Sequence, residues 1–88
     1  MPDGNPLPQT TEEAKETIRR FVLMRFAAAR NMVLSDEVSL LEAGVIDSLG
    51  IMDIINFLEE TFGIQVRDQD LVRENFDNIS ALARFVHA

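Results

Sequence analysis

The stretch "SLGIMDIINFLEETFG", residues 48–63, decides how this chain folds. Its large apolar residues recur three and four positions apart, which is the spacing of one face of an amphipathic α-helix. Gly63 follows the last of them, at the place where helices commonly end on a glycine. The pattern therefore predicts a helix that starts at Ser48 and buries a stripe made of Ile51, Ile54, Ile55, Leu58 and Phe62.

Ser48 directly follows Asp47 and stands at the predicted start of this helix. Serine is a favoured N-cap, because its side-chain oxygen accepts a hydrogen bond from an unpaired backbone N–H of the first turn. From the residues alone, capping is the simplest role for Ser48. A catalytic nucleophile would need a base within hydrogen-bond reach, and the single histidine, His87, stands next to the C-terminus. The third possible role is attachment of a group that another enzyme delivers.

A first helix is predicted upstream of this stretch. Thr10 and Glu13 have the spacing of a capping box, and apolar residues then recur at helical spacing to about Asn31. Residues 1–10 contain three prolines and a glycine and predict a disordered leader, so that the domain spans residues 11–88. The buried side of the first helix is expected to carry Ala14, Ile18, Phe21, Val22 and Arg25 or Phe26.

The other segments predict a long loop, a short turn and a last helix. Residues 32–46 have no sustained period, Gly44 provides a turn within them, and their buried residues are expected to be Val38, Leu40, Leu41 and Ile46. Asp68–Val72 predicts one short helical turn, and Asp77 or Asn78 is positioned to cap the last helix. Together these segments predict an all-α fold, a small antiparallel bundle of three main helices plus one short helix, with a long loop between helices 1 and 2.

Composition narrows the possible classes of function. The chain has 88 residues and a net charge of −7, which disfavours nucleic acid and anionic membrane as partners and favours basic protein surfaces. It has no cysteine, and hence no disulfide or thiolate metal site. Its apolar runs are far shorter than the roughly 20 residues that span a bilayer. We expect a cytoplasmic monomer without a metal site.

The charges are unevenly distributed along the chain. Residues 14–34 contain five basic residues and one acid, whereas residues 35–70 contain nine acids and one arginine. An individual acid in such a segment is expected on a solvated surface. As a group around Ser48, the acids favour recognition by a basic partner.

The stretch "GVIDSLGIMDIINFLEETFGIQV", residues 44–66, resembles the signature of acyl carrier proteins. In that family Asp-Ser-Leu opens the second helix, and a Glu-Glu-x-Phe-Gly-Ile stretch closes it. The similarity extends over residues 11–87, with "DQDL" at the place of the short third helix and "NFDNISALARFV" similar to the last helix. The resemblance implies a carrier rather than an enzyme.

The resemblance also implies a role for each residue around the helix start. Ser48 would accept a 4′-phosphopantetheine arm from coenzyme A, and the thiol of the arm would hold an acyl group as a thioester. Asp47 would help the phosphopantetheinyl transferase to dock or assist its metal. Other implied partners are a loading ligase and acyl-transfer enzymes of fatty-acid, lipid or specialised-metabolite biosynthesis. These partners would contact Leu49 and Met52, and their basic patches would meet Asp53, Glu59 and Glu60.

Two features depart from the fatty-acid carriers. Gly50 stands where those carriers usually have an acid, and "AGVIDSLG" is similar to D-alanyl carriers and to stand-alone carriers of specialised pathways. An aminoacyl or D-alanyl cargo is therefore the first alternative, and an unmodified acidic helical adaptor is the second. Gly50 also costs the helix about 1 kcal/mol relative to alanine, which we interpret as a sign that the arm or a partner approaches closely there.

Overall fold

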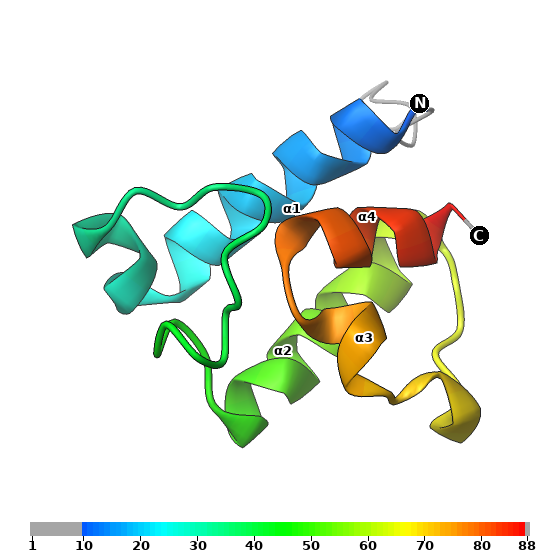
Figure 1. Ribbon diagram of the computed structural model, residues 1–88. Helices are drawn as coiled ribbons and strands as arrows, with labels where there is room; N and C mark the ends of the chain where they lie inside the picture. The colour runs from blue at the N-terminus through cyan, green and yellow to red at the C-terminus, as the bar shows by residue number, and fades with distance from the viewer. Residues whose placement is uncertain (1–9, 88) are drawn as a thin grey trace.

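The computed structural model describes residues 10–87, which are helical with connecting loops and contain no strand (Figure 1). The longer helices are α1 (Thr11–Arg25), α2 (Ser48–Phe62) and α4 (Ile79–Val86), and the short ones are η1 (Ala27–Asn31), η2 (Asp68–Asp70) and α3 (Arg73–Phe76). The predicted all-α fold with a long loop before the second long helix is confirmed. None of the described helices is long and apolar enough to span a bilayer. The predicted leader lies outside the described residues apart from Thr10.

The start of α1, the start of α4 and the end of α2 follow the predicted signals. Thr10 Oγ1 accepts a hydrogen bond from the Glu13 N–H at 3.0 Å, and the Glu13 carboxylate accepts one from the Thr10 N–H at 3.1 Å. Asn78 is the cap of α4, since its side chain accepts a hydrogen bond from the Ala81 N–H at 2.7 Å. Gly63 ends α2 with φ of 68°, in the left-handed region that glycine adopts at little cost.

The predicted extension of the first helix to residue 31 was wrong. α1 stops at Arg25, Phe26 is extended, and η1 follows as a separate 3₁₀ turn. Arg30 provides the physical reason, because its guanidinium folds back and donates to the carbonyl oxygens of Leu23 and Met24 at 2.8 and 3.0 Å. Carbonyls at the end of a helix lack partners within it, so these bonds stabilise the break.

The hydrophobic core forms where the three long helices meet the loop between α1 and α2. Of the residues predicted to be buried, Leu40, Ile54 and Leu58 are fully buried, whereas Phe21 and Phe62 pack partly exposed at the edge of the core. Ile79 of α4 is also fully buried, and Ile64 packs partly exposed at the edge. The loop contributes Leu34, Leu40, Val45 and Ile46 to the core, and the predicted Val38 and Leu41 are half-buried beside it. Phe57, which the predicted stripe did not include, stacks on Phe21 with ring centroids 4.0 Å apart.

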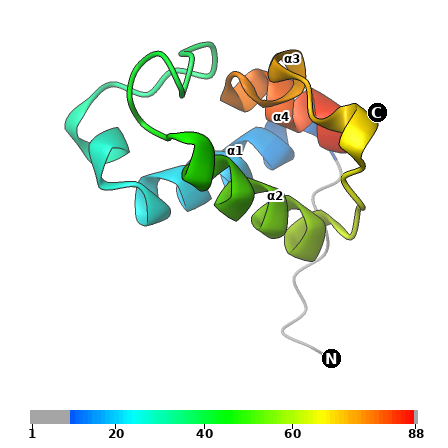
Figure 2. The ribbon, with the colours of Figure 1, turned by 90° about the horizontal axis from the view of Figure 1, so that it is seen from below.

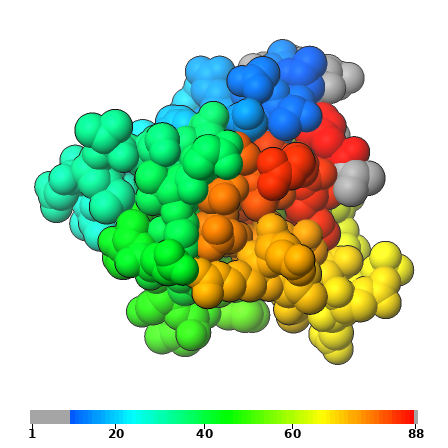
Figure 3. Space-filling model, viewed as in Figure 1, coloured from blue at the N-terminus to red at the C-terminus, as the bar shows by residue number. Residues whose placement is uncertain are grey.

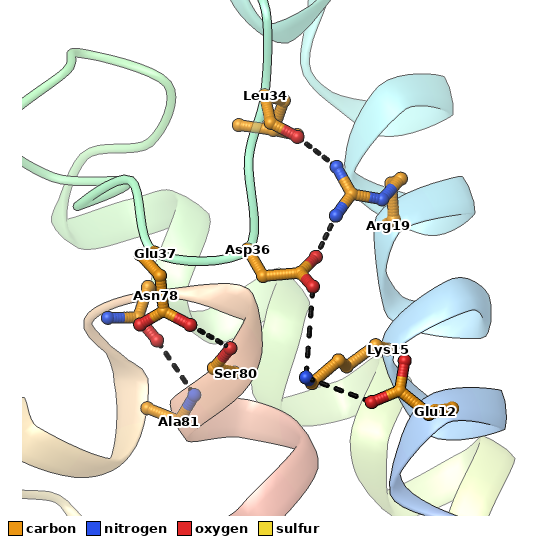
Figure 4. A network of polar contacts seen from close by, with 9 residues as sticks. All are labelled: Glu12, Lys15, Arg19, Leu34, Asp36, Glu37, Asn78, Ser80 and Ala81. Atoms are coloured by element: carbon orange, nitrogen blue, oxygen red, sulfur yellow. Dashed lines mark hydrogen bonds and ion pairs between the residues drawn. The ribbon is translucent and has the colours of Figure 1, made fainter.

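Charged and polar contacts tie the long loop to α1 and to α4 (Figure 4). The Asp36 carboxylate forms an ion pair with Arg19 and lies 3.8 Å from Lys15 Nζ, both on α1. The Asp36 carbonyl accepts a hydrogen bond from the Ser80 N–H at 3.1 Å, and the Ser80 hydroxyl donates to the Glu37 carboxylate at 2.6 Å. This point of the loop therefore joins the first helix to the last.

The start of α2 packs closely on the core at Gly50. This residue is buried, and a Cβ atom at this position would lie 3.1 Å from both Ile46 Cβ and the Phe26 ring. Our interpretation of Gly50 as a sign of an approaching arm or partner was therefore wrong. The missing side chain lets the first turn of α2 lie against Ile46 and Phe26.

Asp36→Asn is predicted to lower the free energy of unfolding by about 1–2 kcal/mol, because it removes the charged partner of two half-buried cations, Lys15 and Arg19. Urea unfolding followed by circular dichroism measures the loss. The control is Glu16→Gln, which removes the exposed Glu16–Arg20 pair of α1 and should cost less than about 0.5 kcal/mol. Equal losses in the two variants would contradict the role of Asp36 as an anchor.

Gly50→Val is predicted to cost about 1–3 kcal/mol, because a branched side chain must displace Ile46 or Phe26 from a well-packed position. Asn56→Val is the matched control, since Asn56 is exposed on the same helix and valine there changes only helix propensity. That control should cost less than about 0.5 kcal/mol. A Gly50→Val protein as stable as the control would show that the first turn is not closely packed.

Candidate functional site

Ser48 is the first residue of α2, and its side chain is exposed. The predicted role of Ser48 as the N-cap was wrong, because the cap is Asp47. Asp47 has the extended backbone of a cap, and its Oδ1 accepts a hydrogen bond from the Gly50 N–H at 2.8 Å. Aspartate and serine are about equally good caps, so residue type alone did not distinguish the two neighbours. Since the Asp47 side chain accepts the hydrogen bond of the cap from the Gly50 N–H, the Ser48 hydroxyl is not needed as the cap.

The surroundings of Ser48 do not suit nucleophilic catalysis. A serine nucleophile needs a base within hydrogen-bond reach. His87 directly follows α4, and Figures 1 and 2 both place the end of α4 well away from the start of α2. The acid beside Ser48 is Asp47, which is already engaged as the cap.

Two large apolar side chains are exposed beside Ser48. Leu49 is 77% exposed and Met52 is 55% exposed. Met52 lies four residues after Ser48 and therefore on the same side of the helix. Glu60 is also exposed on α2, about 18 Å from Ser48 along the helix axis at 1.5 Å per residue. These three predicted partner-facing residues are thus all available at the surface of one helix.

The other two predicted partner-facing residues make contacts within the chain. The Asp53 carboxylate forms an ion pair with Arg25 of α1 at 2.7 Å. The Glu59 carboxylate accepts a hydrogen bond from the Val66 N–H at 3.0 Å and so holds the segment that follows α2. Neither carboxylate is free in the way that an isolated surface acid would be. The sequence gives little sign of these contacts, because both partners come from other elements.

An apolar pocket of about 340 Å³ opens beside Met52. Its walls are α2, Leu41 of the long loop, and residues 71–76, which include α3. Its lining residues are Leu41, Ile51, Met52, Ile55, Leu71, Val72, Arg73 and Phe76. In the sequence these residues pointed to no pocket, because the four-residue helix α3, which forms the far wall, is too short to show a period.

The pocket lies on the face of α2 that carries Ser48. Ile51 and Met52 follow Ser48 by three and four residues, and Ile55 follows it by seven. Residues at these spacings share one face of a helix. A group attached to Ser48 would therefore leave the helix in line with the apolar wall of the pocket.

The family model described as the phosphopantetheine attachment site matches residues 22–86. A comparison with curated proteins finds no match. The geometry fits the chemistry of this family, because the chain presents an exposed serine hydroxyl at the start of a capped helix. The match covers most of the chain, including all of α2 and α4. The chain therefore belongs to the phosphopantetheine attachment site family, whose members are non-catalytic carriers with a covalent 4′-phosphopantetheine arm.

Proposed function

We propose that this carrier bears its arm on Ser48 and holds an acyl group there as a thioester. It would pass the acyl group between enzymes of fatty-acid, lipid or specialised-metabolite biosynthesis. The single observation that supports this cargo is the apolar pocket on the Ser48 face of α2. When attached, the arm supplies the thiol that the cysteine-free chain lacks.

The position of Ser48 supports its role as the attachment residue. Its hydroxyl is exposed, so a transferase can reach it without unfolding the helix. The phosphodiester would lie at the N-terminus of α2, where unpaired N–H groups and the helix dipole favour an anion. Asp47 and Gly50 hold this turn in place from the other side, through the cap and the close packing.

The lining of the pocket favours an acyl over an aminoacyl cargo. Each methylene that moves from water into the pocket stabilises the bound chain by about 0.8 kcal/mol. An ammonium group would instead lose its solvation in such an apolar site. A volume of about 340 Å³ lies at the lower end of the range for small-molecule sites. An aminoacyl or D-alanyl group would gain little from this pocket.

Partner enzymes are proposed to contact the exposed residues of α2. Leu49 and Met52 offer apolar area next to Ser48, and buried apolar anchors dominate the stability of many interfaces. Glu60 offers an exposed charge, which acts mainly on the rate of association with a basic surface. Asp53 and Glu59 are expected to contribute less charge to such a surface, because their carboxylates already bond to Arg25 and Val66.

Incubation with coenzyme A and a broad-specificity transferase is predicted to add one arm to the wild-type protein and none to Ser48→Ala, as intact mass spectrometry would show. Ser48→Ala should change the free energy of unfolding by less than about 0.5 kcal/mol, because Ser48 is not the cap. A Ser48→Ala protein that still gains an arm would contradict the assignment.

The adjacent acid provides the matched comparison for that experiment. Asp47→Ala removes the cap and should cost about 1 kcal/mol. Asp47→Asn keeps a capping oxygen but removes the charge. Slower modification of Asp47→Asn than of the wild type would show that the charge of Asp47 assists the transferase, beyond its role in the helix.

An octanoyl thioester on the wild-type carrier is predicted to react with hydroxylamine at least about fourfold more slowly than an alanyl thioester, which is the factor that one buried methylene provides. Both rates are divided by those of the same thioesters on free pantetheine, which removes their intrinsic difference in reactivity. Val72→Ser, in the pocket wall, should reduce the protection, whereas Val33→Ser, at an exposed position outside the lining, should not. Equal corrected rates for the two cargoes would favour the aminoacyl alternative.

A further inference from the structure

The pocket is closed on one side by contacts between the long loop and the segment around α3. Asp77, directly after α3, binds the loop through its backbone and its side chain. Its carbonyl accepts a hydrogen bond from the Leu40 N–H at 2.8 Å, and its carboxylate accepts one from the Ser39 hydroxyl at 2.8 Å. These groups are buried or half-buried. Figure 3 shows the green loop lying directly against the orange segment that contains α3 and the start of α4.

A second, outer contact joins the same two segments at the surface. The Arg73 guanidinium of α3 forms an ion pair with Glu42, which follows the lining residue Leu41, and its Nε lies 3.5 Å from Asp77 Oδ1. The pKa of Arg73 is raised, chiefly by the hydrogen bond to Glu42 and secondarily by the charges of Glu42 and Asp77. The side chains of Arg73 and Glu42 are 58% and 71% exposed, so this contact is weak enough to open.

Besides this ion pair, α3 is held chiefly by the packing of Phe76 on Phe85 and by a hydrogen bond from the Asn75 side chain to the Asp70 carbonyl at 2.8 Å. It contains four residues, of which Phe76 alone is buried. The residues before it, Leu71 and Val72, are exposed although they are large and apolar. A segment with few buried contacts is one that opens at low cost. Asp77 would hold one end of this segment, while the pair of Arg73 and Glu42 holds its outer side.

We propose that the Arg73–Glu42 ion pair is a latch that closes the pocket between the loop and α3 and thereby controls entry and exit of the acyl chain. The proposal rests on the proposed function, because it takes the acyl chain to lie in this pocket. Opening the latch frees the segment of residues 71–76, which carries four lining residues, while the bonds of Asp77 keep the fold intact. High salt weakens an exposed ion pair, so the closed state is favoured at low ionic strength.

The test compares Glu42→Gln with Glu16→Gln. The control removes another exposed Arg–Glu pair, that of Arg20 with side chains 67% and 70% exposed, on a helix that contributes nothing to the pocket lining. Amide hydrogen exchange of Asn75 in the protein without an arm reports opening of α3, since this N–H bonds to the Val72 carbonyl. Exchange should be about two- to fivefold faster in Glu42→Gln, the factor that loss of one exposed ion pair allows, and unchanged in the control.

The same variants are then compared as loaded carriers, by the rate at which hydroxylamine cleaves the thioester. The octanoyl thioester of Glu42→Gln should react with hydroxylamine about two- to fivefold faster than that of the wild type at low salt, and the difference should vanish near 1 M salt, where screening acts within about 3 Å. Glu42→Lys, which repels Arg73, should give a larger effect than Glu42→Gln. The matched Glu16→Lys should give none.

The outcomes separate the latch from the function on which it rests. If both Glu42 variants show the same amide exchange and the same thioester protection as the wild type, the latch is overturned. The acyl function would still stand as long as an octanoyl thioester is protected better than an acetyl thioester. Equal protection of octanoyl and acetyl in the wild type would overturn the acyl function, and the latch as a gate would fall with it.

Discussion

The hydrogen bond from the Gly50 N–H to the Asp47 carboxylate fixes the first turn of α2, and the site depends on that turn. The absence of a side chain at Gly50 lets the same turn lie against Phe26 and Ile46. With one side of the turn held in this way, Ser48 starts the helix with its hydroxyl exposed. The residues three, four and seven positions later then form the pocket wall in line with it.

Charge pairing within the chain accounts for part of its uneven charge distribution. Basic residues of α1 pair with acids that come later in the sequence, namely Arg19 with Asp36 and Arg25 with Asp53. The first pair holds the long loop, and the second joins α1 to α2. The acidic segment thus stabilises the fold, in addition to any role in partner binding. The surface that remains for partners combines apolar area with a smaller number of free carboxylates.

The sequence predicts those features that depend on local patterns. Periodicity and caps were sufficient for the position of α2, its end at Gly63 and the capping box at Thr10. The break after Arg25 could not be predicted, because it depends on Arg30 folding back on the carbonyls of α1. The cap of α2 was ambiguous because Asp47 and Ser48 are neighbours with equal capping ability. The pocket could not be predicted either, since it needs the far wall that the short helix α3 provides.

In the proposed function, an acyl chain attached through the arm at Ser48 lies in the pocket between α2 and α3. The most direct measurement is isotope-filtered NMR of the carrier loaded with octanoyl, with the acetyl-loaded carrier as the reference. Nuclear Overhauser contacts are expected from the far end of the octanoyl chain to the methyl groups of Ile55, Leu71 and Val72. Contacts confined to Leu49, or a spectrum identical to that of the acetyl form away from Ser48, would contradict this position of the chain.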